Sequence, residues 1–245
     1  MYYVKQNFEN GNKLEDSQLN YVEDGIVDLY KQTSCGHHCL NKPYEFNGKK
    51  ALFFGDSITY GFVKATGAQA TNGGYPKIFS EKVGLNFTNN GASGSTLGAK
   101  YEGYPYIFEK IQSRVSHYAT TDYIFIAGGI NDWQLGIDLD TFRAGVEAIC
   151  AYLKENYTKE VIFITPINHS GRAPTNTPVG EVQDYRDIIT EVALMNGYSV
   201  VQGNLFNFPT AHNTEAYQVS MFGDDLHPTE LGYEMYAKSL LTALC

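Results

Sequence analysis

Five short apolar runs recur along the sequence from residue 50 onward, separated by longer segments in which apolar residues follow helical spacing. The runs are bounded by Gly, Pro or Asn and are rich in β-branched or aromatic residues, as buried strands are. They are KALFF (50–54), LNFTNN (85–90), DYIFIAG (122–128), EVIFITP (160–166) and YSVVQG (198–203). Alternating strands and helices predict a parallel sheet with helices on both faces. The expected fold is therefore an α/β, three-layer α/β/α sandwich whose central parallel sheet has about five strands, as in flavodoxin-like folds.

Candidate helices fill the segments between these runs. The clearest has Asp140 as its N-cap and places four apolar residues on one face: Phe142, Val146, Ile149 and Leu153. Further helices are predicted over 75–83, 104–117, 181–196 and 229–243. The last of these has Pro228 at its first turn, where proline is favoured. In folds of this kind, ligands bind beyond the carboxyl ends of the strands.

Residues 1–47 differ in character from the rest of the chain. Their stretch ENGNKLEDSQLNYVEDG is polar, with scattered aromatic residues and no lasting period. We interpret residues 1–47 as an extension that packs on the domain, on a partner subunit or on an upstream module. A homo-oligomer formed through this extension is one of these options. Residues 48–245 are expected to form the catalytic domain.

Composition and charge exclude some classes of function. The net charge of −9 and the pI near 5.1 disfavour a nucleic-acid partner, because phosphate binding needs patches of Lys and Arg. We also expect no membrane span, since no apolar run approaches about 20 residues. The first residues show no apolar signal-peptide segment. The localisation therefore stays open, with the cytoplasm as the default and secretion or particle association if the sequence is truncated.

Cysteine and histidine gather in the segment CGHHC (35–39). A zinc site there would take its four ligands from five adjacent residues, unlike the two separated pairs of structural zinc sites. We therefore expect no metal and favour a polar loop, with or without a local disulfide. Stoichiometric zinc in a bound-metal analysis would overturn this expectation.

The turn GDSIT (55–59) follows the first predicted strand and sets Ser57 at the carboxyl end of the sheet. A serine in this place is most often a helix N-cap. The G-x-S-x-G elbow of α/β-hydrolases is not matched, because Thr59 stands where the second glycine belongs. The turn alone therefore leaves Ser57 open between a helix cap and a nucleophile.

Three further polar stretches lie at expected strand or helix ends, and they favour the nucleophile. NNGASGST (89–96) is rich in glycine, so that its backbone N–H groups can approach a ligand. GGIND (128–132) offers an uncharged Asn amide, which suits an oxyanion. DDLHP (224–228) brings a carboxylate within reach of an imidazole three residues later. Together they supply a nucleophile, a base, an acid and oxyanion donors on one side of the sheet.

These four stretches, in this order, resemble the sequence blocks of the GDSL family of SGNH hydrolases. The resemblance covers about residues 48–245. The segments NGKKALFFGDSIT, GGINDW and DDLHPTELGYEMYA in particular are similar to small bacterial members. The resemblance implies the SGNH-hydrolase fold and a serine esterase that uses neither a metal nor an organic cofactor. Residues 1–47 show no such resemblance.

The resemblance also implies roles for the matching residues, which are Ser57, Gly94, Asn131, Asp224 and His227. Ser57 would be the nucleophile, His227 the base and Asp224 the acid that orients the base. The oxyanion would be bound by the backbone N–H groups of Ser57 and Gly94 and by the side-chain amide of Asn131. Asp225, an additional carboxylate, would either raise the basicity of the histidine or face solvent.

The expected substrate is a small-molecule or glycan ester with a short acyl group, above all an acetyl ester of a carbohydrate. No apolar lid helix or long apolar groove is evident in the sequence, which disfavours long lipid chains. The alternatives are a lysophospholipase or thioesterase, and a glycan-binding or structural module with incidental catalysis. Aromatic residues near the blocks could stack on sugar rings: Tyr60, Phe62, Tyr101, Tyr104 and Trp133. Candidate substrate-binding residues are Asp56, Trp133, His169 and Arg172, the last two in a loop that should border the site.

Overall fold

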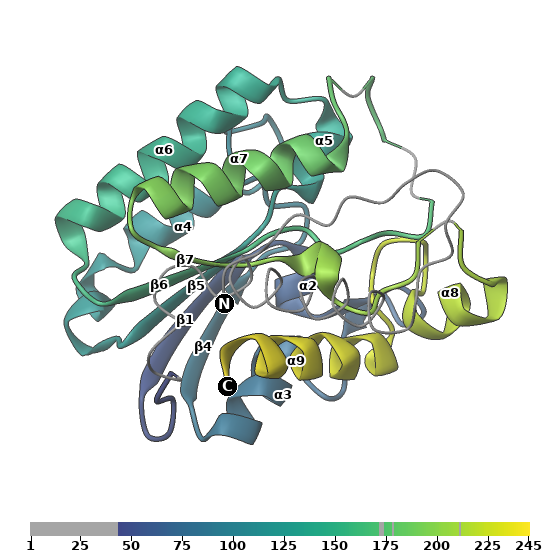
Figure 1. Cartoon of the computed structure of the whole chain (residues 1–245), viewed down its shortest axis with the longest axis horizontal. Helices are drawn as coiled ribbons and strands as arrows, with labels where there is room; N and C mark the ends of the chain where they lie inside the picture. The colour runs from purple at the N-terminus through teal and green to yellow at the C-terminus, as the bar shows by residue number, and fades with distance from the viewer. Residues whose placement is uncertain (1–43, 172–173, 178, 211) are drawn as a thin grey trace, which may run out of the picture.

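The computed structural model describes residues 44–171, 174–177, 179–210 and 212–245, which fold around one parallel sheet (Figure 1). The sheet has five strands in the order β4-β1-β5-β6-β7, and every neighbouring pair is parallel. The strands are β1 (Lys50–Gly55), β4 (Asn86–Gly91), β5 (Tyr123–Ala127), β6 (Glu160–Ile164) and β7 (Ser199–Val201). Each corresponds to one of the five apolar runs, so the predicted strands are confirmed.

Helices cover both faces of this sheet, which confirms the three-layer α/β/α architecture (Figure 1). One face carries α3 (Gly74–Val83) and α9 (Glu230–Leu244), which pack against each other. The other face carries α4 (Ile107–Ser113), α6 (Leu139–Asn156) and α7 (Val182–Met195). In α3, α6, α7 and α9 the buried residues recur at helical spacing, because one side of each helix packs on the sheet or on a neighbouring helix.

Two predicted helix starts are wrong by a residue or two. The N-cap of α6 is Asp138, whose carboxylate accepts a hydrogen bond from the Thr141 N–H at 2.8 Å, and Asp140 lies in the first turn. The N-cap of α9 is Thr229, so Pro228 precedes the helix instead of starting it. The segment predicted as one helix over 104–117 is α4 followed by a 3₁₀ helix over Val115–Thr120.

Several short elements were not predicted, because a helix or strand of two to seven residues carries too few apolar positions to show a period. They are α2 (Ser57–Tyr60), α5 (Ile130–Leu135), α8 (Glu215–Met221), a 3₁₀ turn at Gly203–Leu205, and the hairpin of β2 (Phe62–Val63) with β3 (Ala68–Gln69).

The strand register brings the candidate blocks to one edge of the sheet. Gly55, at the end of β1, lies opposite Gly91 of β4 on one side and Ala127 of β5 on the other. The chain therefore leaves these three neighbouring strands at the same level. The segments that begin there carry the first three candidate blocks.

Aromatic side chains fill the core beneath this edge. Phe53 and Phe125 stack with their ring centroids 4.3 Å apart. Phe46, from the part of the predicted extension that the structure describes, is only 3% exposed and packs on Phe79 and Tyr123. Residue 46 is therefore part of the core around the sheet, although it precedes the first strand.

The two edges of the sheet differ from its centre. The edge strand β4 reads NFTNNG, with Asn86 and Thr88 exposed, whereas β5 reads YIFIA and is buried throughout. The opposite edge strand, β7, is only three residues long. The apolar, fully paired strands thus lie inside the sheet.

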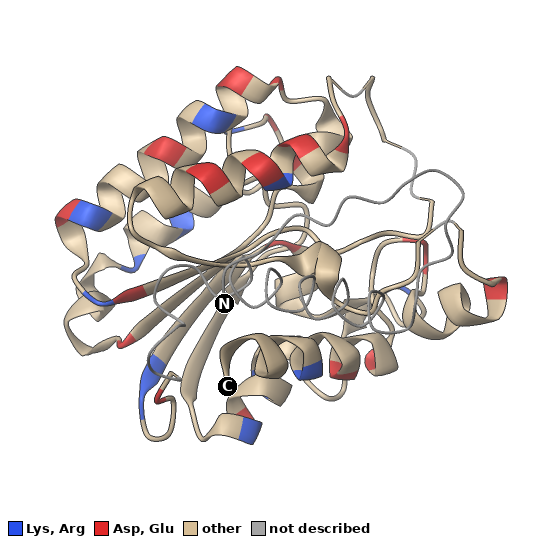
Figure 2. Ribbon diagram, viewed as in Figure 1, with Lys and Arg blue, Asp and Glu red and all other residues tan. Residues whose placement is uncertain are grey.

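Lys and Arg of the described residues are spread over several elements, and along α6 and α7 they alternate with acidic residues (Figure 2). None of the described helices combines the length and the apolar character that a bilayer crossing requires. Within the described ranges, no three His, Cys, Asp or Glu side chains are grouped so that they could hold a metal ion. The CGHHC segment lies outside those ranges.

Candidate active site

Ser57 is the first residue of α2, and only Asp56 separates it from the end of β1. The side chain of Asp56 caps this short helix by accepting a hydrogen bond from the Ile58 N–H at 2.9 Å. Gly61 ends the helix in a left-handed conformation. The serine is thereby held at the carboxyl end of β1, with its backbone N–H at the start of a helix.

His227 lies beside Ser57 although 170 residues separate the two in sequence. Its Nε2 is 2.9 Å from the Ser57 Oγ. Its Nδ1 is 2.9 Å from both carboxylate oxygens of Asp224, and one of these oxygens also accepts the His227 backbone N–H at 2.8 Å. The carboxylate therefore contacts the histidine at both its ring and its backbone. A hydroxyl, an imidazole and a carboxylate in this series can activate the hydroxyl as a nucleophile.

The two ends of the segment that carries Asp224 and His227 are bonded to each other. The Gly223 N–H donates to the His227 carbonyl at 2.8 Å, and Phe222 pairs with Pro228. The ring of Phe62 contacts the imidazole edge to face, with the centroids 4.8 Å apart. The imidazole is thus supported from a second element, β2.

The glycine-rich block after β4 lies next to α2, the helix that begins at Ser57. The side-chain amide of Asn89 donates to the Thr59 carbonyl at 2.8 Å, which ties this block to α2. Gly94 has φ +79°, a conformation that side chains with a Cβ rarely adopt. A Cβ at this position would lie 3.3 Å from the Tyr104 ring. The block therefore requires glycine here and carries an aromatic ring directly over it.

Asn131, on α5, joins the third block to the second. Its side-chain amide donates to the Ser95 carbonyl at 2.9 Å, next to Gly94. An amide NH₂ has a second hydrogen to donate, so the same group can also bind a ligand oxygen. The structure thus brings Ser57, Gly94, Asn131, Asp224 and His227 to the carboxyl edge of the sheet, as the sequence blocks predicted.

Two buried carboxylates support these blocks from within. Asp132 accepts the N–H groups of Leu97 and Gly98, each at 2.8 Å. Burial raises the pKa of Asp132 to about 6, and those N–H bonds oppose the shift. Burial likewise raises the pKa of Asp56 to about 7, with a smaller contribution from the nearby Asp132 and with the Ile58 N–H bond opposing it.

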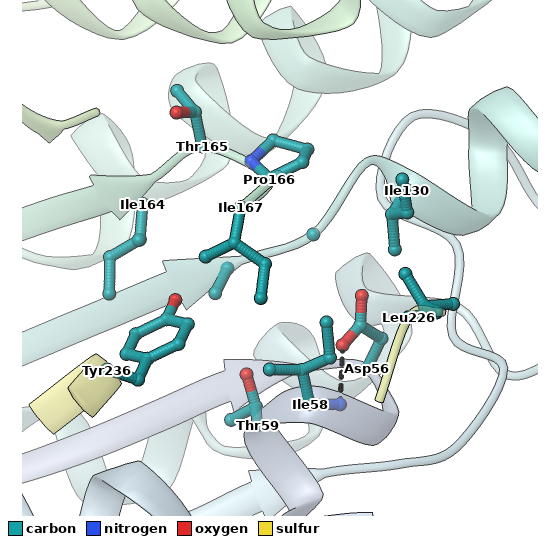
Figure 3. A pocket seen from close by; sticks show the side chains of 12 residues that line it. Asp56, Ile58, Thr59, Ile130, Ile164, Thr165, Pro166, Ile167, Leu226 and Tyr236 are labelled. Carbon is teal, nitrogen blue, oxygen red and sulfur yellow. Dashed lines mark hydrogen bonds between the residues drawn. The ribbon is translucent and has the colours of Figure 1, made fainter. Parts of the chain in front are cut away.

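A small internal cavity of about 20 Å³ lies beside Asp56 (Figure 3). The carboxyl group of Asp56 faces it, together with apolar side chains such as Ile130 and Leu226 and the ring of Tyr236. This volume is close to the least that holds one water molecule. Asp56 is 3% exposed, so its carboxyl group lies inside the protein, at the start of α2.

The remaining residues predicted to contact substrate are placed differently. Trp133 is buried, and its indole N–H donates to the Gly180 carbonyl at 3.1 Å. The ring of His169 packs on this indole with the centroids 5.2 Å apart. Burial, and then the charge of Arg186, lowers the pKa of His169. Arg172 lies outside the residues that the structure describes.

Three residues near the site make contacts that the sequence did not predict. Asp132 anchors the loop after Gly94, Tyr104 covers Gly94, and Ser170 bonds to Asp225 through both its backbone and its side chain. The only signal for Asp132 was its place in GGIND, directly after the predicted oxyanion donor. The other two contacts join loops whose approach is not encoded in any local pattern.

A scan against family models matches residues 53–235 to the GDSL-like lipase/acylhydrolase family. Among solved structures, the lipase/acylhydrolase from Enterococcus faecalis is similar at 22% identity with a TM-score of 0.58, covering 79% of this chain and 94% of that one. A carbohydrate acetylesterase family member from Sinorhizobium meliloti is similar at 16% identity with a TM-score of 0.62, covering 78% and 95%. The aryl esterase of M. smegmatis is similar at 15% identity with a TM-score of 0.59, covering 81% and 100%. The comparison with curated proteins gave no match.

Proposed function

Because this chain belongs to the GDSL-like lipase/acylhydrolase family and is a carboxylic ester hydrolase, we propose that it cleaves short-chain acyl esters, above all acetyl esters of carbohydrates. The observation that carries the mechanism is the hydrogen-bonded series from Ser57 through His227 to Asp224. These three side chains perform both halves of an acyl transfer to water.

In the first half, the Ser57 Oγ attacks the ester carbonyl carbon while His227 Nε2 takes the hydroxyl proton. Asp224 holds the ring with Nδ1 protonated and stabilises the imidazolium that forms. The imidazolium then gives its proton to the departing alcohol, which leaves an acyl-serine. In the second half, a water molecule loses a proton to His227 and attacks the acyl carbon. The imidazolium then returns that proton to the Ser57 Oγ as the bond from the serine to the acyl carbon breaks, and the carboxylic acid leaves.

The negative charge that develops on the carbonyl oxygen is stabilised by neutral donors. We assign this role to the backbone N–H groups of Ser57 and Gly94 and to the side-chain amide of Asn131. The Asn131 amide already bonds to Ser95, beside Gly94, so the two donors belong to one rigid unit. Donors fixed before the reaction need not reorganise as the charge forms.

A carbohydrate as the alcohol portion is supported by the aromatic residues next to Gly94. Tyr104 is 40% exposed and lies over Gly94, and the ring of Tyr101 contacts it edge to face at 5.6 Å. The Tyr101 hydroxyl also accepts a hydrogen bond from the Asn176 amide at 3.3 Å. An aromatic face with polar groups beside it suits a sugar ring, which has apolar faces and hydroxyl edges. The name of the similar S. meliloti protein, a carbohydrate acetylesterase family member, agrees with this proposal.

The first test compares p-nitrophenyl acetate, butyrate and octanoate as substrates for the wild type and Ser57→Ala, with mass analysis after treatment with a fluorophosphonate. We expect a Ser57 adduct and a preference for acetate that the substitution abolishes. Activity that rises with acyl length would favour a lysophospholipase or thioesterase. Glycan binding with no serine-dependent turnover would favour a binding module.

The alcohol portion is tested with Tyr104→Ala on three acetates: ethyl acetate, phenyl acetate and an O-acetylated oligosaccharide. We expect kcat/KM to fall about tenfold for the oligosaccharide, the loss of about 1.4 kcal/mol of ring contact, and to stay within twofold for ethyl acetate. A loss confined to phenyl acetate would point to an aryl ester instead. Equal losses on all three would remove Tyr104 from the alcohol site.

A further inference from the structure

Two consecutive residues, His169 and Ser170, contact both halves of the candidate site. They belong to the segment 166–170, which follows β6; we call it the β6 loop. The His169 ring packs on Trp133, two residues beyond Asn131 on α5. The Ser170 N–H donates to the Asp225 carbonyl at 2.9 Å, and its hydroxyl donates to the Asp225 carboxylate at 3.2 Å. One loop thus joins the helix of the proposed oxyanion donor to the segment of the proposed acid and base.

Asp225 has a backbone conformation that needs such support. Its φ is +65°, and among the described residues it is the only non-glycine with a positive φ. Residues with a Cβ enter this region at a cost and remain there only where their surroundings fix them. The two hydrogen bonds from Ser170, which is 7% exposed, supply that constraint. Because Asp224 precedes Asp225 directly, the same bonds fix the backbone from which the Asp224 carboxylate reaches His227.

A buried cation on α7 donates hydrogen bonds to the β6 loop. Arg186 of α7 is 7% exposed, and its guanidinium donates to the Pro166 carbonyl at 2.8 Å and the Ile167 carbonyl at 2.9 Å. It also donates to the Asn168 side chain at 3.2 Å, while the Asn168 amide donates to the Asn204 carbonyl at 3.1 Å. Residues 166–168 of the loop are therefore anchored to α7 and to the segment after β7, and the next two residues contact the site.

We infer that Ser170 is a positioning residue, which holds the Asp224–His227 segment in register with Ser57 by fixing Asp225 to the β6 loop. The inference rests on the proposed roles of Ser57, Asp224 and His227. Without the Ser170 hydroxyl, Asp225 keeps only one of its two bonds to the loop. The imidazole then spends less time at hydrogen-bond distance from the Ser57 Oγ. Turnover should fall while substrate binding stays the same, because the hydroxyl acts through Asp225 and not on the substrate.

The test measures kcat and KM for p-nitrophenyl acetate, and the rate at which a fluorophosphonate labels Ser57. We expect Ser170→Ala to lower kcat and the labelling rate together, by about tenfold, with KM within twofold of the wild type. Asp225→Asn keeps an acceptor oxygen and should retain most of the activity. Asp225→Gly suits the positive φ but lacks the acceptor, so it should match Ser170→Ala. Ser113→Ala removes a comparable hydroxyl at the exposed end of α4 and should leave kcat unchanged.

The double variant Ser170→Ala with Asp225→Gly tests whether the two residues act through one contact. If the two residues act through one contact, the double variant loses no more kcat than either single variant. Losses that multiply would overturn the inference, as would a Ser170→Ala enzyme with kcat within twofold of the wild type. Ser57→Ala is measured alongside. If this variant keeps its turnover, the proposed function itself fails. If Ser57→Ala loses its turnover but Ser170→Ala does not, the proposed function stands and the role for Ser170 fails.

Discussion

Among single residues, Asn131 links two segments of the site through one side chain, so its substitution tests the proposed oxyanion stabilisation. We expect Asn131→Ala to lower kcat by about 10²- to 10³-fold, the usual cost of losing one such donor, while the protein stays folded. Asn131→Asp, which keeps the shape but cannot donate, should be at least as damaging. Wild-type turnover in either variant, measured with p-nitrophenyl acetate beside a thermal melt, would contradict the assignment.

The raised pKa of Asp56 predicts that the free energy of unfolding depends on pH. Its pKa in the folded protein, about 7, lies above the ordinary value of 3.8, so the folded state binds this proton more tightly than the unfolded chain does. The resulting stabilisation is complete below about pH 4 and is lost as the pH rises through 7. Asp132, with a pKa of about 6, adds a change of the same sign.

The unfolding free energy of the wild type should therefore decrease between pH 4 and pH 8. We expect this decrease to be smaller in Asp56→Asn, which keeps an oxygen to cap α2. At pH 8 the variant should be more stable than the wild type by roughly 2–4 kcal/mol, at about 1.4 kcal/mol per unit of pKa. Urea titrations at several pH values measure this. Asp140→Asn, at an exposed position on α6, is the control and should leave the slope unchanged. A variant that keeps the wild-type slope would show that Asp56 does not bear the proton.

At this scale the sequence predicted the main contacts of the site and missed their supports. Ser57, Asp224 and His227 could be predicted to meet, because each belongs to a short polar block at an expected strand or helix end. The bond between Ser170 and Asp225 joins residues 55 apart, and the bonds from Leu97 and Gly98 to Asp132 join residues about 35 apart. Such pairs depend on how two loops approach each other, which no local pattern encodes.

At the scale of secondary-structure elements, α6 packs closely on the loop that Asp132 anchors. A Cβ on Gly145 of α6 would collide with the carbonyl of Gly98. We expect Gly145→Ala to destabilise the protein by about 1–3 kcal/mol, because this overpacking outweighs a gain in helix propensity of about 1 kcal/mol. Urea denaturation measures the change. Ala148→Gly, at an exposed position of the same helix, should show the propensity effect alone, a loss of about 1 kcal/mol. A Gly145→Ala protein as stable as the wild type would contradict the close contact.

The elements themselves were predictable where they form a short apolar run or repeat a helical period. The long helices α3, α6, α7 and α9 bury one side, and β1, β5, β6 and β7 are buried on both faces. These helices and all five strands were found at nearly their observed bounds. The helices that carry Ser57 and Asn131 have four and six residues and could not be found this way. Helices of this length depend on tertiary contacts and caps for their stability, so the sequence shows them only through the blocks they carry.

At the scale of the whole molecule, the folded unit begins before its first strand. Phe46 is buried among Phe79, Tyr123 and Phe125, although the sequence placed residues 1–47 in an extension. The test compares the urea denaturation of the full chain with that of two shorter proteins, one starting at residue 44 and one at residue 48. One that starts at residue 48 should lose about 3–5 kcal/mol, the usual cost of removing a buried Phe side chain.

The substitution Phe46→Ala in the full-length chain is the control for this truncation, and it should reproduce most of the loss. If the protein that starts at residue 48 is as stable as the full chain, the whole of 1–47 is dispensable for folding and Phe46 contributes little. If the protein that starts at residue 44 is already destabilised, residues 1–43 contribute to the folded unit as well.

The polar edge strand β4 and the short edge strand β7 bear on how copies of this protein behave in concentrated solution. An open strand edge exposes N–H and C=O groups to which a strand of another molecule can add. Here the longer edge carries Asn86 and Thr88 at exposed positions, and the other edge extends over three residues. Neither edge of the described sheet presents a long apolar strand, the kind of edge at which molecules most readily add to one another. The sheet therefore keeps its long apolar strands at the centre, where the neighbouring blocks of the site begin, and places a polar strand and a short strand at the described edges.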